Sequence, residues 1–182
     1  TGVLFGDGSG AVVLQESNDE SQILSTHLYA DGDGVEHLIA KAPGSVFNPL
    51  RIDEDIVKDR MHLPYQNGRE VFKNAVKRMP EAINVALEHN NLSVDDVSLV
   101  VAHQANRRIL EACAERMKLP MEKMYINIQK YGNTTAATIP IALCEAIEEG
   151  KFTKGDNIIL TAFGAGYTCL LYTSDAADER NS

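Results

Sequence analysis

Three polar segments of the sequence carry groups that could stabilise a negatively charged oxygen. His103 follows directly on an apolar run at residues 98–102, Asn133 lies between Gly132 and two threonines, and residues 164–166 read Gly-Ala-Gly. An imidazole, a carboxamide and glycine-rich backbone N–H groups are the donors with which proteins hold a developing oxyanion. The sequence therefore indicates a site at which negative charge develops on oxygen.

The elements around these segments alternate between strands and helices. Apolar runs predict strands at residues 98–102, 124–128 and 157–163, and apolar residues at helical spacing predict helices at residues 68–90, 106–117 and 136–149. Pro80 is expected to kink or restart the first of these helices. The alternation predicts an α/β fold, with a mixed sheet and helices on its faces. Ligands of such sheets bind beyond the carboxyl ends of the strands, where the three polar segments should converge.

The flanking regions are less regular. Strands are expected at residues 11–14 and 23–29, joined by a turn at residues 18–20, and a last strand at residues 167–172. Residues 30–66 contain scattered Gly, Pro, Asp and Asn without a period, which predicts little regular structure there.

Composition narrows the class of protein. At 182 residues, with 44% hydrophobic and 24% charged residues, the chain is expected to form a single globular domain. The net charge of −9 argues against a nucleic-acid surface, and the sequence contains no apolar run long enough for a membrane helix. Its three cysteines lack CxxC or Cys/His spacing. That pattern favours reduced thiols in the cytoplasm over disulfides or a metal site.

Both ends of the sequence are unusual. The chain begins without Met inside an apolar run, which suggests that it is the later part of a longer protein. Near its end, a strand pattern gives way to small polar and acidic residues. We therefore expect a domain at residues 1–169 and a non-native or disordered tail at residues 170–182.

Several motifs together resemble one family. From the start of the chain to its end, these motifs are FGDGSGAVVL, NGREVFKNAV, HQAN followed by Arg, YGNTTAATIPIAL and AFGAGYT. Their order and spacing are those of the family. They resemble the carboxyl-terminal half of the β-ketoacyl-acyl-carrier-protein synthase III family, over roughly residues 1–169. The resemblance implies a thiolase-like fold, in which two similar halves build a five-layer αβαβα architecture and the enzyme is a homodimer. It implies condensation of an acyl-CoA primer with malonyl-acyl-carrier protein, the first condensation of type II fatty-acid synthesis.

The resemblance assigns His103 and Asn133 to a Cys-His-Asn catalytic site. Its nucleophilic cysteine lies in the amino-terminal half of the family, and Cys113, Cys144 and Cys169 do not match it. Loss of carbon dioxide from the malonyl thioester places negative charge on the thioester oxygen, which two neutral N–H donors can hold. A position at the start of a helix is expected to keep His103 neutral through the helix dipole.

Other matched positions imply binding roles. The docking of an acidic carrier protein is assigned to Arg108 and Lys73, and Lys73 belongs to a basic stripe with Arg69 and Lys77. No cofactor or metal is implied beyond the acyl-CoA and carrier-protein substrates. The implied contacts with substrate and CoA fall on Gly68, Arg69, Phe72, Asn106, Phe163 and Ala165.

Other interpretations remain open. Phe72 and Phe163 fit plain core positions equally well, and exposed lysines need no partner. Within the same fold, the chain could belong to a polyketide or hydroxymethylglutaryl-CoA type of condensing enzyme. A non-catalytic half that only dimerises or binds carrier protein is the alternative from another class, although such a scaffold would need neither His103 nor Asn133.

Overall fold

A four-stranded mixed sheet forms the centre of the computed structural model, which describes residues 3–16, 22–44 and 52–175. The strand order is β1-β6-β5-β4, with β4 parallel to β5 and β6 antiparallel to both of its neighbours. The strands are β1 (Ile23–Tyr29), β4 (Val97–Ala102), β5 (Asn157–Phe163) and β6 (Cys169–Asp175). Because β4 and β5 are parallel, the segments that follow them leave the same edge of the sheet.

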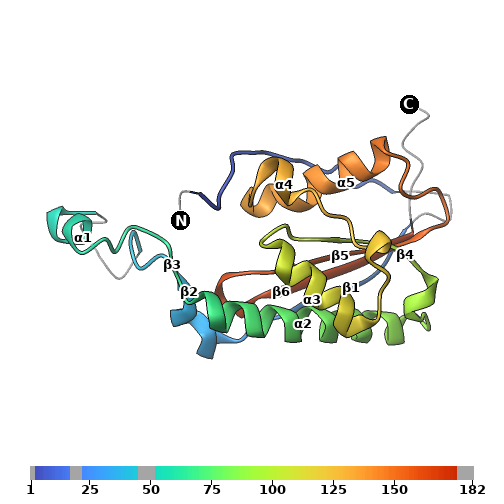
Figure 1. Ribbon diagram of the computed structural model, residues 1–182, viewed down its shortest axis with the longest axis horizontal. Coiled ribbons are helices and arrows are strands. Elements are labelled where there is room, and N and C mark those ends of the chain that lie inside the picture. The colour runs from blue at the N-terminus through green and yellow to red at the C-terminus, as the bar shows by residue number, and fades with distance from the viewer. Residues whose placement is uncertain (1–2, 17–21, 45–51, 176–182) are drawn as a thin grey trace.

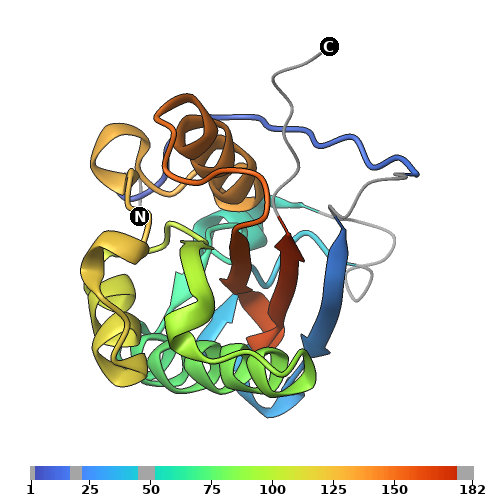
Figure 2. The ribbon, with the colours of Figure 1, turned by 90° about the vertical axis from the view of Figure 1, so that its right-hand side faces the viewer.

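Helices cover both faces of this sheet (Figures 1 and 2). On one face lie α2 (Gly68–His89) and α3 (Arg107–Met117), and α5 (Thr138–Glu148) lies on the other. The buried side chains accordingly form two clusters, and β4 contributes Val100 to the first and Leu99 and Val101 to the second. The predicted α/β class, with helices on the faces of a mixed sheet, is confirmed.

Helix α2 differs from its prediction at Pro80. It is one continuous helix of 22 residues, and Pro80 lies buried inside it. Its buried face includes Val71, Ala75 and Met79, at intervals of four residues, and continues beyond the proline with Ile83. We attribute the continuity to packing, because apolar contacts on both sides of Pro80 offset the backbone hydrogen bond that proline cannot donate.

The expected strand at residues 11–14 does not form. This segment is described but carries no strand pairing, and the side chains of Val13 and Leu14 are 86% and 77% exposed. Apolar β-branched residues become a strand only where a neighbouring strand accepts them, and β1 pairs with β6 instead. The turn predicted at residues 18–20 lies outside the described residues.

The expected strand at residues 124–128 is reduced to a single bridge. Met124 bridges Val100 of β4, Tyr125 N–H donates to the Val100 carbonyl at 2.9 Å, and α4 (Ile128–Tyr131) begins soon after. The side chain of Gln104 takes the place of a longer ladder, because it bonds the backbone of Tyr125 and Asn127. A side-chain amide thus satisfies backbone groups that a strand partner would otherwise satisfy.

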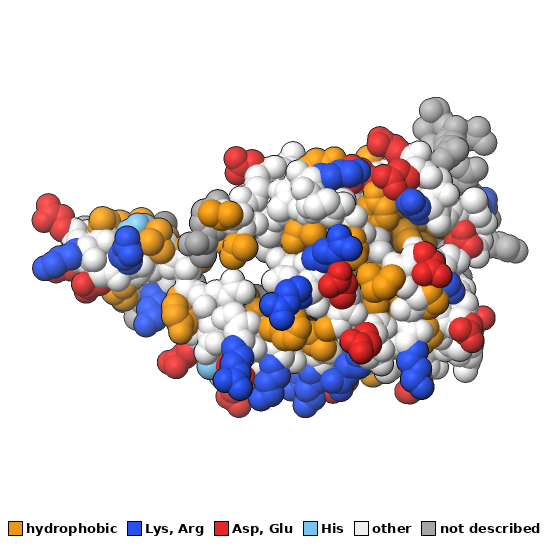
Figure 3. All heavy atoms as spheres, in the orientation of Figure 1, with side chains coloured by type: hydrophobic (Ala, Val, Ile, Leu, Met, Phe, Trp, Pro, Cys, Tyr) orange, Lys and Arg blue, Asp and Glu red, His pale blue; other side chains and the backbone are white. Residues whose placement is uncertain are grey.

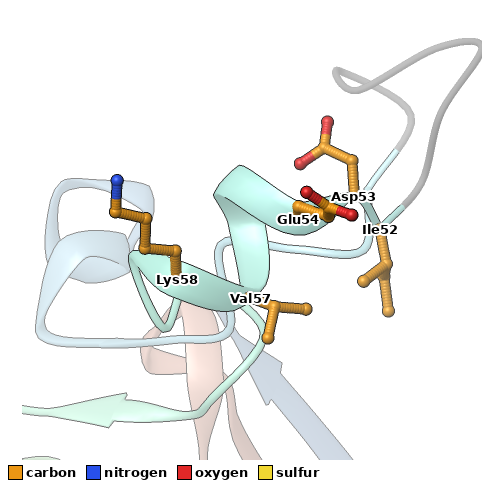
Figure 4. A pocket seen from close by; sticks show the side chains of 5 residues that line it. All are labelled: Ile52, Asp53, Glu54, Val57 and Lys58. Atoms are coloured by element: carbon orange, nitrogen blue, oxygen red, sulfur yellow. The ribbon is translucent and has the colours of Figure 1, made fainter.

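Residues 30–66, expected to be irregular, contain several short elements. A two-stranded antiparallel sheet pairs β2 with β3, and α1 projects away from the central sheet (Figure 1). A shallow hollow beside α1 is lined by residues 52–54, Val57 and Lys58, and Ile52 and Val57 point to the same side (Figure 4). The elements of this region are η1 (Gly32–His37), β2 (Leu38–Ile39), α1 (Glu54–Lys58) and β3 (Tyr65–Gln66).

Strand β6 runs past residue 169, after which the tail was predicted to begin. Strand β6 pairs with β5 as far as Asp175, and Leu171 and Thr173 are fully buried. The boundary expected between residues 169 and 170 therefore falls inside the central sheet, because hydrogen bonds to β5 and burial order these residues. Within the described ranges, every helix is too short or too polar to cross a membrane.

Candidate active site

The backbone at His103 is fixed across the two parallel strands. His103 is the first residue after β4, and its N–H donates to the carbonyl of Thr161 in β5 at 2.8 Å. Its own carbonyl accepts from Ala105 N–H at 2.9 Å. These two hydrogen bonds fix the backbone of His103, and so the origin of its side chain, at the carboxyl edge of the sheet, where ligands of α/β proteins bind.

The imidazole of His103 is partly buried and hydrogen bonded. Its Nδ1 lies 2.6 Å from the hydroxyl oxygen of Thr138, the first residue of α5. Burial lowers the pKa of His103 and so favours its neutral form. Helix α3 begins only at Arg107, with Asn106 as its cap, so His103 precedes the first turn of α3, and a contribution of a helix dipole to this pKa stays a prediction.

Asn133 is held by backbone and side chain alike. Its N–H donates to the Leu4 carbonyl at 2.9 Å, and its carbonyl accepts from Gly6 N–H at 3.0 Å. Its Oδ1 accepts from Thr135 N–H at 2.8 Å. Since the oxygen end of the amide is engaged in this way, the NH₂ end is the one that can donate to a ligand.

A run of hydrogen bonds joins these two residues. The Thr138 hydroxyl oxygen lies 2.9 Å from the Thr135 carbonyl oxygen, while Thr135 N–H holds the side chain of Asn133. Together with the contact between His103 and Thr138, these bonds form what we call the His103–Asn133 chain. The structure thus links the two predicted catalytic residues, which are 30 positions apart in the sequence, through two threonines.

The residue after His103 has a role that the sequence analysis missed. Gln104 is 1% exposed, and its Nε2 donates to the carbonyls of Ala102 at 2.8 Å and Tyr125 at 3.1 Å. Its Oε1 accepts from Asn127 N–H at 3.1 Å. A buried amide with this many bonds ties the segment that bears His103 to the one that leads to Asn133. The signal was a glutamine two positions after a buried strand, where a loop residue would be expected to face solvent.

A second support continues from Asn127 to α5. The Asn127 side chain donates to the carboxylate of Glu145 at 2.7 Å, which also accepts from Tyr131 Oη at 2.7 Å and Lys130 Nζ at 3.1 Å. Burial alone would raise the pKa of Glu145, but the hydrogen bonds from these three residues outweigh it and lower that pKa. Glu145 therefore stays ionised and fastens α4, which precedes Asn133, to the helix that carries Thr138.

The predicted docking and substrate residues gather at the start of α2 and α3. The Arg108 guanidinium lies 5.9 Å from the centre of the Phe72 ring, a cation–π distance, so the structure brings these two residues together. Lys73 is exposed, with its Nζ 3.9 Å from Glu70. Arg69, Lys73 and Arg108 are called the basic rim below. Figure 3 shows basic side chains in a row over α2, with acidic ones among them.

Three further predicted residues have structural roles of their own. Asn106 caps α3, since its side chain accepts from Arg108 N–H at 2.9 Å. Phe163 is 6% exposed in the cluster on the α2 side, with its ring 5.2 Å from that of Tyr167. Ala165 is exposed at the start of the turn η6 (Ala165–Tyr167). Capping and packing account for Asn106 and Phe163, and contacts of all three with substrate stay predictions, as does that of the exposed Gly68.

A sequence profile described as 3-oxoacyl-[acyl-carrier-protein (ACP)] synthase III C terminal matches residues 87–173, and one described as 3-oxoacyl-[acyl-carrier-protein (ACP)] synthase III matches residues 1–32. A β-ketoacyl-[acyl-carrier-protein] synthase III of Chlorobium phaeobacteroides is 48% identical over 170 residues, which are 92% of this chain and 51% of that protein. The chain belongs to the β-ketoacyl-acyl-carrier-protein synthase III family.

Solved structures of synthase III proteins agree with this membership. The protein from Aquifex aeolicus superposes with a TM-score of 0.83 at 45% identity, over 96% of this chain and 51% of that one. The protein from Thermus thermophilus superposes with a TM-score of 0.78 at 36% identity, over 97% and 53%. The predicted thiolase-like fold is confirmed, and the chain spans about half the length of the synthase III relatives it matches.

The cysteines of this synthase III chain are poorly suited to act as nucleophiles. Burial raises the pKa of Cys113 to about 12 and that of Cys169 to about 11, so both stay protonated near neutral pH. Cys144 is exposed within α5. None of the three begins a helix, where a thiolate is stabilised.

Proposed function

We propose that the full-length enzyme, meaning this chain together with the part of a synthase III that it does not span, catalyses a decarboxylative Claisen condensation. It joins an acyl-CoA primer to malonyl-acyl-carrier protein and so initiates type II fatty-acid synthesis. The His103–Asn133 chain carries this proposal, because it fixes an imidazole and a carboxamide relative to each other. Family membership supplies the reaction class.

The first chemical role of the two residues is in decarboxylation. The bond between the malonyl α-carbon and its carboxylate breaks, carbon dioxide leaves, and the electron pair forms an enolate whose oxygen carries the charge. The NH₂ group of Asn133 and an N–H of neutral His103 donate to that oxygen. Both donors are in place before the charge develops, so little reorganisation opposes the reaction.

The enolate then forms the new carbon–carbon bond. Its carbon attacks the carbonyl of an acyl-cysteine thioester, the tetrahedral intermediate collapses, and the cysteine leaves as a thiolate. We assign that cysteine to the part of the enzyme outside this chain, since Cys113 and Cys169 are held protonated by burial. The backbone N–H near Ala165 is the proposed donor to the second oxyanion. This chain alone is accordingly expected to form no acyl-enzyme.

The partners follow from the same reaction. We propose that acyl carrier protein docks on the basic rim, where Arg108 and Lys73 face its acidic surface, and that acyl-CoA enters past Arg69 and Phe72. The enzyme is proposed to be a cytoplasmic homodimer that needs no cofactor. The cation–π distance of 5.9 Å between Arg108 and the Phe72 ring supports a continuous path, because it places one residue of the docking surface beside one of the substrate approach.

The decisive experiment removes the imidazole. His103→Ala in the full-length enzyme should lower the turnover for malonyl-carrier-protein decarboxylation by about 10²–10³-fold, the usual cost of one oxyanion donor. Binding of carrier protein should hardly change, since the partly buried ring is not on the basic rim. His89→Ala is the matched control, because His89 is exposed at the end of α2. Decarboxylation by His103→Ala at the wild-type rate would refute the proposed function.

A further inference from the structure

The hydroxyl group of Thr138 lies between two possible hydrogen-bond acceptors, one of them on His103. It is 2% exposed, and its hydroxyl oxygen lies 2.6 Å from Nδ1 of His103 and 2.9 Å from the carbonyl oxygen of Thr135. A hydroxyl has only one proton to donate. It therefore donates either to the imidazole or to the carbonyl, and the choice decides which nitrogen of neutral His103 carries the ring proton.

The surrounding bonds favour donation to the imidazole. The Thr135 carbonyl already accepts from the backbone N–H of Thr138, so it does not depend on the hydroxyl. Nδ1 of His103 is the nearer acceptor. Leaving a buried acceptor unpaired is costly, and among the described residues no other side chain bonds the ring of His103. Donation to Nδ1 therefore uses the shorter of the two contacts and leaves the Thr135 carbonyl with its backbone donor.

We propose that Thr138 is a positioning residue that holds neutral His103 in the tautomer protonated at Nε2. With the hydroxyl donating to Nδ1, that nitrogen must be bare, and the ring proton resides on Nε2. Resting on the proposed function, this gives His103 the N–H that an enolate oxygen requires. In the opposite tautomer, Nε2 would present a lone pair to the developing charge and repel it.

The same residue also affects the second donor. Thr138 contacts Thr135, whose N–H orients the amide of Asn133. The orientations of His103 and Asn133 therefore both depend on Thr138, the first residue of α5. Loss of the hydroxyl frees the imidazole directly, whereas the backbone bond between Thr138 and Thr135 remains to hold Asn133. The effect should consequently fall on His103 first.

The experiment compares Thr138→Val with Thr138→Ser in the full-length enzyme. Valine keeps the shape of threonine without its hydroxyl, and serine keeps the hydroxyl without the methyl group. Nitrogen-15 NMR of histidine-labelled enzyme reports which ring nitrogen is protonated, and the signals of His103 are those missing from His103→Ala. If Thr138→Val does not fold, Thr138→Ala removes the same hydroxyl and takes its place.

The wild type and Thr138→Ser should show a bare Nδ1 and a protonated Nε2, and Thr138→Val should show a mixture of tautomers. The kcat for malonyl-carrier-protein decarboxylation should fall about 10-fold in Thr138→Val, because the ring loses its fixed orientation as well as its single tautomer; loss of the partners that orient metal-bound histidines has an effect of this size. Its KM and primer transacylation should stay near wild type.

Two results would overturn the role of Thr138. One is a wild-type ring protonated at Nδ1, and the other is a tautomer or a kcat that Thr138→Val leaves unchanged. Neither depends on the outcome for His103→Ala, which tests the proposed function by itself.

Discussion

The His103–Asn133 chain is partly buried, whereas the basic rim is exposed to solvent. Links in the chain measure 2.6, 2.9 and 2.8 Å and involve the buried hydroxyl of Thr138. In the basic rim, the Lys73 side chain is 75% exposed and its ion pair with Glu70 measures 3.9 Å. Interactions away from water are strong and little screened, whereas exposed charges act over a distance and weaken with salt. His103 and Arg108 stand five positions apart in the sequence, yet should respond differently to the same experiments.

The largest effect is expected at Asn133. Asn133→Ala in the full-length enzyme should lower decarboxylation by about 10²–10³-fold through loss of one donor. Asn133→Asp should lower it further, because a carboxylate accepts the same bond from Thr135 N–H but repels the enolate. Steady-state decarboxylation of malonyl-carrier protein measures both. If the Asp variant were as active as wild type, the amide would not face the developing charge.

A smaller effect, dependent on salt, is expected on the basic rim. Arg108→Ala should lower kcat/KM for malonyl-carrier protein several-fold at low ionic strength and much less at high ionic strength, because screening already removes the attraction. Primer transacylation should be nearly spared. Arg107→Ala is the matched control, since Arg107 is engaged with Glu111 at 2.8 Å. Equal losses for the two variants would count against docking at Arg108.

The smallest effect concerns stability and pH. Burial lowers the folded-state pKa of His103 below its ordinary value of 6.5, so the unfolded state takes up this proton first as pH falls. The stability contributed by neutral His103 is therefore complete above that value and is lost as pH falls through the folded pKa. The melting temperature of wild type should decline more steeply than that of His103→Gln between about pH 7 and 5. Parallel curves from calorimetry would show that His103 titrates normally.

Much of the fold was predictable from apolar periodicity. Residues 157–163 and the long helix α2 follow their patterns because each buries a continuous face. Predictions failed where one contact from elsewhere in the chain decides the outcome. Residues 124–128 look like a strand, but the side chain of Gln104 takes up their backbone groups, and no local pattern announces that substitution.

The candidate site was predictable in its residues but not in its connections. His103 stands out because it follows an apolar run, and Asn133 because it lies in a glycine- and threonine-rich segment. The family motifs strengthen the assignment of both to the site. Thr138 and Glu145 do not, because a threonine at the start of a helix and a glutamate inside one are ordinary. Their importance comes from distances of 2.6 and 2.7 Å that only the folded chain creates.

The backbone bonds that hold Asn133 between Leu4 and Gly6 also affect the local stability of the site. They join parts of the chain separated by more than a hundred residues, so forming them closes a long loop and costs chain entropy. The segment around Leu4 is otherwise exposed, with a side chain 54% accessible to solvent. We expect it to open locally more readily than the central sheet. We therefore expect hydrogen exchange to show the Asn133 N–H less protected than the N–H groups of the central sheet.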